Sequence, residues 1–185
     1  MMKRAAIFFG TGYEEIEALT VVDLLRRAQI EAVCVSTDNQ DSVTGSHKIS
    51  VAMDAGIDDT DLDSFDILVC PGGMPGTKNL EACKKLTDGI RKFYDSGKLI
   101  AAICAAPSIF GHMGLLEGKR ACIYPGMEAE LKGAEVCYDK VVRAGNIITS
   151  RGMGTAIAFA LEIIAALSDR KTADTLGKGI VYLEG

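Results

Sequence analysis

The stretch KLIAAICAAPSI, residues 98–109, decides the fold. Leu99 to Ile103 form an apolar run after Gly97, and a run this short, bounded by turn residues, predicts a strand buried on both faces. Cys104 follows at once, and Pro107 then suits the first turn of a helix, where its missing N–H would have no partner. The stretch therefore predicts a sharp strand-to-helix corner that carries Cys104.

Two interpretations of Cys104 follow from this corner. The unpaired N–H groups of a helix N-terminus favour negative charge, and cysteines of low pKa occur in such settings. Cysteine is also among the residues most often buried, so a structural core thiol fits the local sequence equally well. The local sequence leaves both interpretations open.

Composition and charge limit the classes of protein. The 185 residues favour a single domain, residues 1–185. A net charge of −5 argues against a nucleic-acid partner. No apolar run approaches the roughly 18 residues of a membrane span, so we expect no membrane partner. The acidic EEIE after the short apolar start argues against a signal peptide.

The six cysteines contain no CxxC pair, so neither a zinc site nor a disulfide framework is predicted. Three of them, Cys34, Cys70 and Cys122, fall in segments that we predict as strands. We therefore expect free thiols, no metal and a cytoplasmic protein.

Strand-like and helix-like segments alternate along the chain. The predicted strands are 3–9, 30–36, 66–70, 99–103, 119–124, 135–138, 141–144 and 147–150, with a hairpin arm at 45–53. The predicted helices are 14–28, 77–96 with a break near 83–87, 108–110, 127–132, 156–167 and 171–178. This alternation is typical of an α/β fold with a mostly parallel, open sheet.

Ligands of such sheets gather at the carboxyl ends of the strands. Three predicted loops share that edge: 10–17, 71–76 and 104–107. The glycines of PGGMPG, residues 71–76, let the backbone approach a ligand and present N–H groups, although a plain strand-to-helix turn explains them as well. We expect a site where the three loops meet.

Cysteine nucleophiles usually work with a histidine base. The chain has only His47, in the predicted hairpin, and His112, a helix length away from Cys104. Neither position suits a catalytic base, so a carboxyl group is the remaining candidate.

Glu17 lies one turn into the first helix and can point back over the sheet edge, whereas we expect Glu14 and Glu15 to be solvated caps. An ionised Glu17 beside Cys104 would raise the pKa of the thiol, and a protonated Glu17 would donate a hydrogen bond to the thiolate. The pair would then share one proton and titrate as a unit.

Four blocks of the chain resemble the DJ-1/ThiJ/PfpI superfamily, most closely its DJ-1 and ThiJ branch. They are GYEEIE at 12–17, LVCPGG at 68–73, AAICAAP at 101–107 and TSRGMGT at 149–155. Their order and spacing follow the family across essentially the whole chain. The resemblance implies a flavodoxin-like, three-layer α/β sandwich with helices on both faces of the sheet, and a homodimer.

The resemblance also implies roles for single residues. Cys104 would be the nucleophile and Glu17 its protonated carboxyl partner. The N–H groups of Gly73 and Ala105 would form an oxyanion site, and Gly72 and Tyr124 would take part in oxyanion or substrate binding beside them.

The chain departs from the superfamily in three places. Ala105 occupies the position where the peptidase and amidotransferase branches have a histidine. Tyr124 replaces a histidine of many relatives; it can donate a hydrogen bond but is a poor base near neutral pH. His47 replaces an arginine of the human-type branch, and we consider a contact between His47 and Asp23.

The activities that the resemblance implies need no cofactor. One is a glyoxalase that converts methylglyoxal to lactate, and the other is a deglycase that repairs glycated protein or nucleotide. The alternative is an oxidative-stress sensor or redox-regulated chaperone that works through oxidation of Cys104. An amidase or peptidase ranks third, for want of a nearby histidine.

Overall fold

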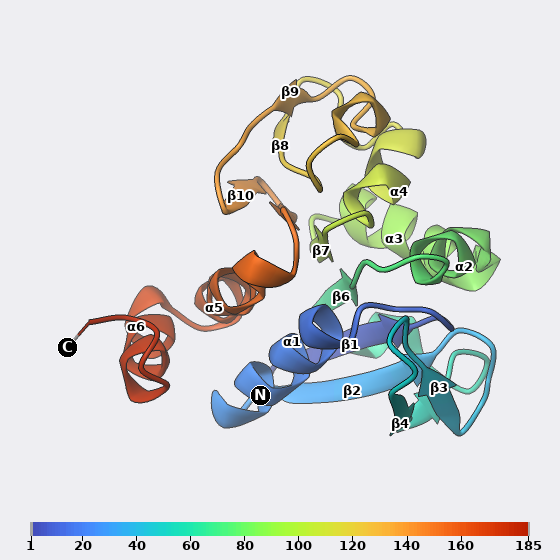
Figure 1. The fold of residues 1–185 in the computed structure, drawn as a ribbon, viewed down its shortest axis with the longest axis horizontal. Helices are drawn as coiled ribbons and strands as arrows, with labels where there is room; N and C mark the ends of the chain where they lie inside the picture. The colour runs from blue at the N-terminus through green and yellow to red at the C-terminus, as the bar shows by residue number, and fades with distance from the viewer. Residues whose placement is uncertain (1, 185) are drawn as a thin grey trace.

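The computed structural model describes residues 2–184, built around a seven-stranded sheet (Figure 1). The strand order is β10-β11-β7-β6-β1-β2-β5, and every neighbouring pair is parallel except β10 with β11. The strands are β1 (Arg4–Phe9), β2 (Glu31–Ser36), β5 (Ala55–Gly56), β6 (Ile67–Cys70), β7 (Leu99–Ile103), β10 (Val141–Ala144) and β11 (Ile147–Ser150). The predicted α/β class with a mostly parallel sheet is confirmed.

Helices cover both faces of this sheet. They are α1 (Glu15–Arg27), α2 (Gly76–Ala82), α3 (Lys84–Asp95), α4 (Pro107–His112), α5 (Ala156–Leu167) and α6 (Arg170–Gly179). Residues of α1, α5 and α6 form one hydrophobic core, and residues of α2, α3 and α4 form the other. The chain thus has the three layers of a flavodoxin-like fold.

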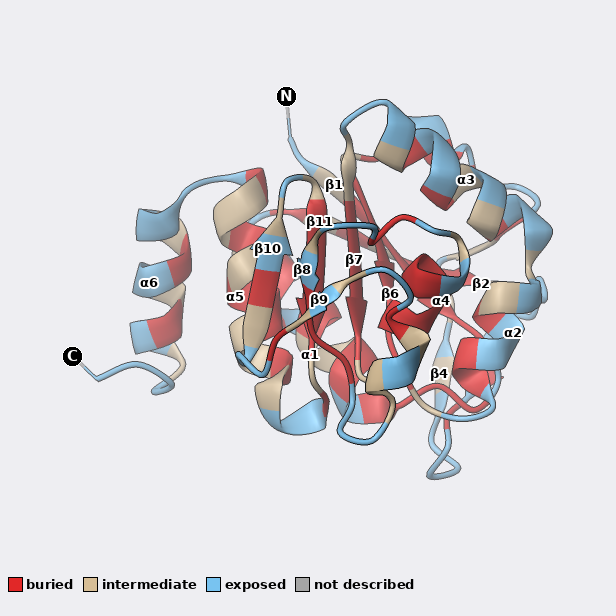
Figure 2. Ribbon diagram, turned by 90° about the horizontal axis from the view of Figure 1, so that it is seen from above, coloured by how far each residue is buried: buried red, intermediate tan, exposed pale blue. Residues whose placement is uncertain are grey.

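The strand β7 shows why the sequence folds this way. Ala101 and Ile103 face the core of α1 and α5, while Ile100 and Ala102 face the core of α3 and α4. Alternate residues of a strand point to opposite faces, so a strand between two helical layers must be apolar at every position. Figure 2 shows the central strands coloured as buried.

Short elements complete the fold. They are the hairpin β3 (Ser42–Thr44) and β4 (Ser50–Ala52), the parallel pair β8 (Arg120–Ala121) and β9 (Glu135–Val136), and the 3₁₀ turns Leu62–Ser64, Glu128–Glu130 and Met153–Thr155. The predicted strand at 119–124 is too long, because pairing with β9 stops at Ala121. Cys122 therefore lies beyond the strand, which corrects its predicted place.

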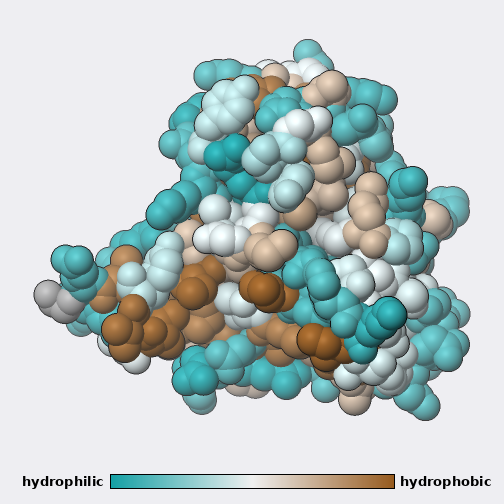
Figure 3. All heavy atoms as spheres, viewed as in Figure 1, coloured by the Kyte–Doolittle hydropathy of each residue, from teal (hydrophilic) through white to brown (hydrophobic). Residues whose placement is uncertain are grey.

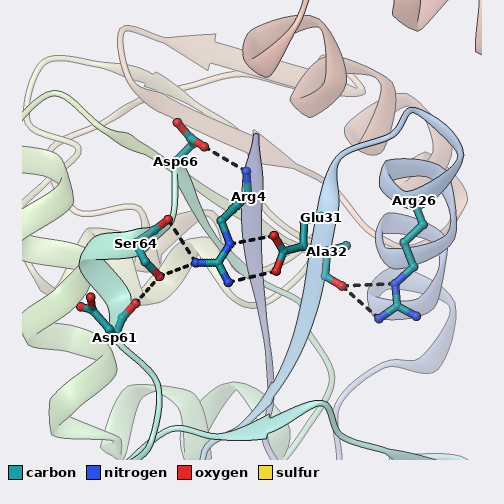
Figure 4. A network of polar contacts seen from close by, with 7 residues as sticks. All are labelled: Arg4, Arg26, Glu31, Ala32, Asp61, Ser64 and Asp66. Carbon is teal, nitrogen blue, oxygen red and sulfur yellow. Dashed lines mark hydrogen bonds and ion pairs between the residues drawn. The ribbon is translucent and has the colours of Figure 1, made fainter. Parts of the chain in front are cut away.

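A polar network closes the amino ends of β1 and β2 (Figure 4). Arg4 forms two hydrogen bonds to the carboxylate of Glu31, at 2.8 and 3.0 Å, and another to the hydroxyl of Ser64 at 2.6 Å. These groups are partly exposed, so each contact contributes on the order of 1 kcal/mol or less. No helix among residues 2–184 is long and apolar enough to cross a membrane.

Candidate active site

Three loops meet at the carboxyl ends of β1, β6 and β7, which are neighbours in the sheet. The N–H of Glu14 donates to the carbonyl of Gly72 at 2.9 Å, and the N–H of Gly76 donates to the carbonyl of Gly12 at 3.2 Å. Gly73 has a φ of 91°, and a Cβ there would lie 2.4 Å from the backbone N of Glu14. The loop after β6 therefore needs glycine to pack against the loop after β1.

Cys104 lies on the predicted corner between β7 and α4. Its φ of 63° is left-handed, a conformation that costs a non-glycine residue on the order of 1–3 kcal/mol. Two backbone hydrogen bonds hold the corner: Cys104 N–H donates to the Ser150 carbonyl at 3.0 Å, and Tyr124 N–H donates to the Cys104 carbonyl at 2.9 Å. The half-buried thiol is thus presented from a rigid, strained backbone.

Glu17 approaches this thiol from α1, and its side chain is fully buried. Its Oε2 accepts the Gly72 N–H at 2.9 Å, while Oε1 has no hydrogen-bond partner of good geometry. Burial raises the pKa of the Glu17 carboxyl from its ordinary 4.5 to about 7, although hydrogen bonding to Cys104 and Gly72 opposes the rise. The carboxyl is therefore protonated in a large fraction of molecules at neutral pH.

Gly72 lies against both the Cys104 side chain and the Glu17 carboxyl group, and it has no side chain of its own. A Cβ on Gly72 would lie 2.6 Å from the Cβ of Cys104 and 2.7 Å from Oε2 of Glu17. Any larger side chain would push the thiol and the carboxyl apart. The close approach of the two groups depends on this glycine.

The proton equilibria of Cys104 and Glu17 are coupled. Burial, together with the charge of an ionised Glu17, raises the pKa of the Cys104 thiol to about 12. The N–H groups of Ala105 and Gly73 donate toward the sulfur and act in the opposite direction. When Glu17 keeps its proton, its repulsion of the thiolate is absent and these N–H groups remain. Burial, the largest cause, still opposes the thiolate, so protonation of Glu17 lowers the pKa of the thiol only in part, and the two groups titrate as a coupled pair.

Tyr124 borders this site through its backbone N–H. Its ring lies beside Gly152, where a Cβ would be 3.4 Å from the ring carbon Cδ2, and about half of the side chain is exposed. The interaction with Cys104 that the structure shows therefore comes from the main chain of Tyr124.

Both histidines have carboxylate partners. His112 has Glu81 at 2.6 Å from Nδ1 and Glu130 at 2.7 Å from Nε2. His47 Nδ1 lies 2.9 Å from Oε2 of Glu15. The contact that we considered between His47 and Asp23 is wrong, since Asp23 binds Arg27 instead.

The prediction that Glu14 and Glu15 are solvated caps is also wrong, because both are more than nine-tenths buried. The loop between β3 and β4 covers them, and His47 N–H donates to Oε1 of Glu15 at 2.7 Å. Burial opposes ionisation of Glu15, but the His47 side chain and backbone N–H groups outweigh it and lower the pKa of Glu15 to about 2.

Among residues 2–184, one group of side chains has ligand atoms close enough together to hold a metal ion, within 4.8 Å of one another. It consists of Glu14, Glu15 and His47. The hydrogen bonds just described already supply donors to Glu15. The closeness of these three side chains is therefore explained by the hydrogen bonds that connect α1 to the hairpin.

Sequence reasoning missed two contacts of the site. The Ser150 carbonyl at the end of β11 anchors Cys104, and the N–H of Gly12 donates to the Thr44 carbonyl of β3 at 2.8 Å. Both are backbone contacts between distant segments, and side-chain patterns carry no signal for them.

Comparison with known proteins identifies the family of this chain. The profile of the DJ-1/PfpI family matches residues 3–166. The protein DJ-1 homolog A of Arabidopsis thaliana is 39% identical over 89% of this chain, and the chain spans only 42% of that protein's length. The glutathione-independent glyoxalase DJR-1.2 of Caenorhabditis elegans is 31% identical over 89% of this chain and 88% of that protein. Oxidized Toxoplasma gondii DJ-1 superposes with a TM-score of 0.94 at 32% identity, covering 98% of this chain and all of that one. The match to the family profile and the shared fold lead to one conclusion: the chain belongs to the DJ-1/PfpI family.

Proposed function

We propose that this protein is a cofactor-independent cysteine enzyme that acts on small reactive aldehydes, with methylglyoxal converted to lactate as the representative reaction. One observation carries the proposal: a half-buried thiol on a strained corner is proton-coupled to a fully buried carboxyl group with a pKa of about 7. A group that titrates near neutral pH is suited to proton transfer in both directions. The glyoxalase name of the C. elegans relative supports the same chemistry.

The first step uses the thiolate of Cys104. Its sulfur attacks the aldehyde carbon of methylglyoxal, a carbon–sulfur bond forms, and the carbonyl electrons move to oxygen. The N–H groups of Gly73 and Ala105, which donate toward the sulfur in the free protein, stabilise that oxyanion. Glu17 gives its proton to this oxygen, so the product is a neutral hemithioacetal on Cys104 and Glu17 is left as a carboxylate.

The second step belongs to Glu17. Its carboxylate removes the proton from the former aldehyde carbon and returns it to the neighbouring carbon, which converts the hemithioacetal to a thioester through an enediol. Water then hydrolyses the thioester, releasing lactate and restoring the thiol. The sum is methylglyoxal plus water giving lactate, so no external oxidant or reductant is needed.

Removal of the proton-transfer group tests this proposal. Glu17→Gln and Glu17→Leu should each lower methylglyoxal turnover at least about a hundredfold, the usual contribution of a general acid–base group. Glu135→Gln, which changes an exposed carboxylate, is the matched control and should retain full turnover. Unchanged turnover in both Glu17 variants would refute the assigned role.

Deglycase repair uses the same first steps on a larger substrate. The thiol would attack an early adduct of an aldehyde with an amine, and hydrolysis would release the amine. An amidase or peptidase reaction is disfavoured, because both histidines bind carboxylates instead of assisting Cys104.

Oxidation sensing at Cys104 is the second candidate. A sulfinate on Cys104 would accept hydrogen bonds from a protonated Glu17 and from nearby N–H groups, and charge-assisted bonds of this kind are strong. Toxoplasma gondii DJ-1 has been solved in an oxidized form. If sensing or chaperone activity is the main role, a peroxide-treated protein should protect an aggregating client and Cys104→Ser should not. Equal protection by the two proteins would exclude the redox mechanism.

A homodimer is proposed from an apolar surface next to α1. Ile16 of α1 and Ile49 of the hairpin are each 52% exposed. A groove is lined by residues of α1, α5 and the end of α6, among them Leu19 and Ile157. Figure 3 shows hydrophobic residues over this part of the surface. Light scattering should give the mass of two chains for the wild type and of one chain for Ile16→Glu. A single-chain mass for the wild type would contradict the proposal.

A further inference from the structure

Two buried cysteines outside the Cys104 site, Cys122 and Cys137, directly follow the ends of β8 and β9 and pack in one cluster. The strands pair in parallel register over Arg120–Ala121 and Glu135–Val136. Cys137 N–H donates to the Ala121 carbonyl at 2.8 Å, which completes the pairing of Ala121 with Val136. Cys122 and Cys137 each follow this last paired position, and they belong to one buried cluster.

The last paired position and the shared cluster place the two thiols near each other. Neighbouring strands lie about 4.8 Å apart, and opposite residues of a parallel ladder point to the same face. Disulfides join residues whose Cα atoms are about 4.4–6.8 Å apart. Both thiols are free in the structure, so the pair is a reduced dithiol.

The two thiols differ in access and in charge. Cys137 keeps 8% of its surface exposed, and the Arg120 Nε donates to its sulfur at 3.1 Å. Cys122 is fully buried, where burial raises the pKa of its thiol to about 11. Reactive cysteines occupy electropositive, partly exposed surroundings, and buried ones are inert toward reagents in solution. Cys137 is therefore the thiol that meets an oxidant first, with Cys122 positioned to attack it.

We propose that Cys137 and Cys122 form a second redox site, a dithiol that a hydroperoxide converts to a reversible disulfide. The Cys137 sulfur attacks the peroxide, the O–O bond breaks, and the products are a sulfenic acid and water. The Cys122 sulfur then attacks the Cys137 sulfur, the S–S bond forms, and the S–O bond breaks as hydroxide leaves with the Cys122 proton as water. A dithiol reductant reverses the reaction.

The position of Cys122 links this site to the Cys104 corner. Cys122 lies two residues before Tyr124, whose N–H donates to the Cys104 carbonyl. The Thr149 hydroxyl also accepts the Cys122 N–H at 3.0 Å, next to the strand end that anchors Cys104. A disulfide would link the segment 122–124 covalently to the end of β9. The proposal does not depend on the aldehyde chemistry of Cys104.

Disulfide mapping tests the proposal directly. The reduced full chain is treated with equimolar hydrogen peroxide, alkylated and digested, both as wild type and as Cys104→Ser. A linked peptide pair containing Cys122 and Cys137 is expected in both proteins, and dithiothreitol should abolish it. If both thiols remain as alkylatable as before treatment, or if Cys137 is oxidised without the crosslink, the proposal is wrong.

Arg120 provides the quantitative control. Arg120→Gln removes the positive charge beside Cys137 but keeps both thiols, and crosslinking should slow roughly tenfold. Arg143→Gln changes another exposed arginine nearby, on β10, and should crosslink at the wild-type rate. Equal rates in the two variants, with thermal unfolding unchanged, would exclude the assigned part of Arg120.

Discussion

Glu17→Gln is the substitution that isolates the titration of the buried carboxyl group. Glutamine keeps the volume of the side chain and an oxygen that can accept the Gly72 N–H, but it stays neutral at every pH. In the wild type, burial raises the pKa of Glu17 from 4.5 to about 7. Between these values the folded protein holds a proton that the unfolded chain has released. Stability must therefore fall as the pH rises through this window.

The size of the effect follows from the rise in pKa. A rise from 4.5 to about 7 corresponds to roughly 3 kcal/mol, because each pKa unit is worth about 1.4 kcal/mol. The stabilising contribution of the protonated carboxyl is complete below pH 4.5 and is lost as the pH passes about 7. The neutral glutamine has no such loss.

Urea unfolding from about pH 5 to about pH 9 measures this difference. The free energy of unfolding of Glu17→Gln, relative to the wild type, should rise by roughly 3 kcal/mol across that range. Glu135→Gln should show no such trend, because its carboxylate is exposed. If the free energies of unfolding of Glu17→Gln and the wild type differ by the same amount at every pH, the pKa of Glu17 is not raised. The proposal that Glu17 shares a proton with Cys104 would then be refuted as well.

Three further predictions concern the same region. Gly72→Ala should destabilise the fold by about 1–3 kcal/mol and lower methylglyoxal turnover, because its Cβ would lie 2.6 Å from that of Cys104. A denaturant midpoint and a turnover rate equal to those of the wild type would contradict this prediction. The pKa of Glu15 is lowered to about 2, so its ionised form stabilises the fold above pH 4.5 and this contribution is lost as the pH falls toward 2. In urea unfolding, Glu15→Gln should therefore cost about 1–3 kcal/mol at pH 7 and less at about pH 3. An equal cost at both pH values would refute the stabilisation of the ionised carboxylate by His47 and the backbone N–H groups. Mild peroxide should add two oxygens to Cys104 but none to the fully buried Cys70, and peptide mass spectrometry that finds both equally oxidised would exclude a tuned thiol.

Local patterns predicted the parts of the fold that depend on burial. The run from Leu99 to Ile103 has no polar residue, and only a strand between two apolar layers explains that composition. Glu17 was singled out because one turn of helix returns a side chain to the sheet edge from which the helix starts. These inferences needed only helical and strand periodicity.

Long-range contacts account for the errors. Glu14 and Glu15 read as solvated caps because their cover, the loop that carries His47, lies some thirty residues further along the chain. The strand after Lys119 was predicted too long because an apolar run does not show where its partner strand ends. The Ser150 carbonyl that anchors Cys104 is a backbone group and leaves no trace in the sequence.

The most direct test of the account is lactate formation from methylglyoxal without any added cofactor, by the wild type and by Cys104→Ala. The thiol is the proposed nucleophile, so the wild type should release lactate and the variant should fall to the uncatalysed rate while its fold is retained. Equal lactate formation by the two proteins would contradict the proposed role of Cys104.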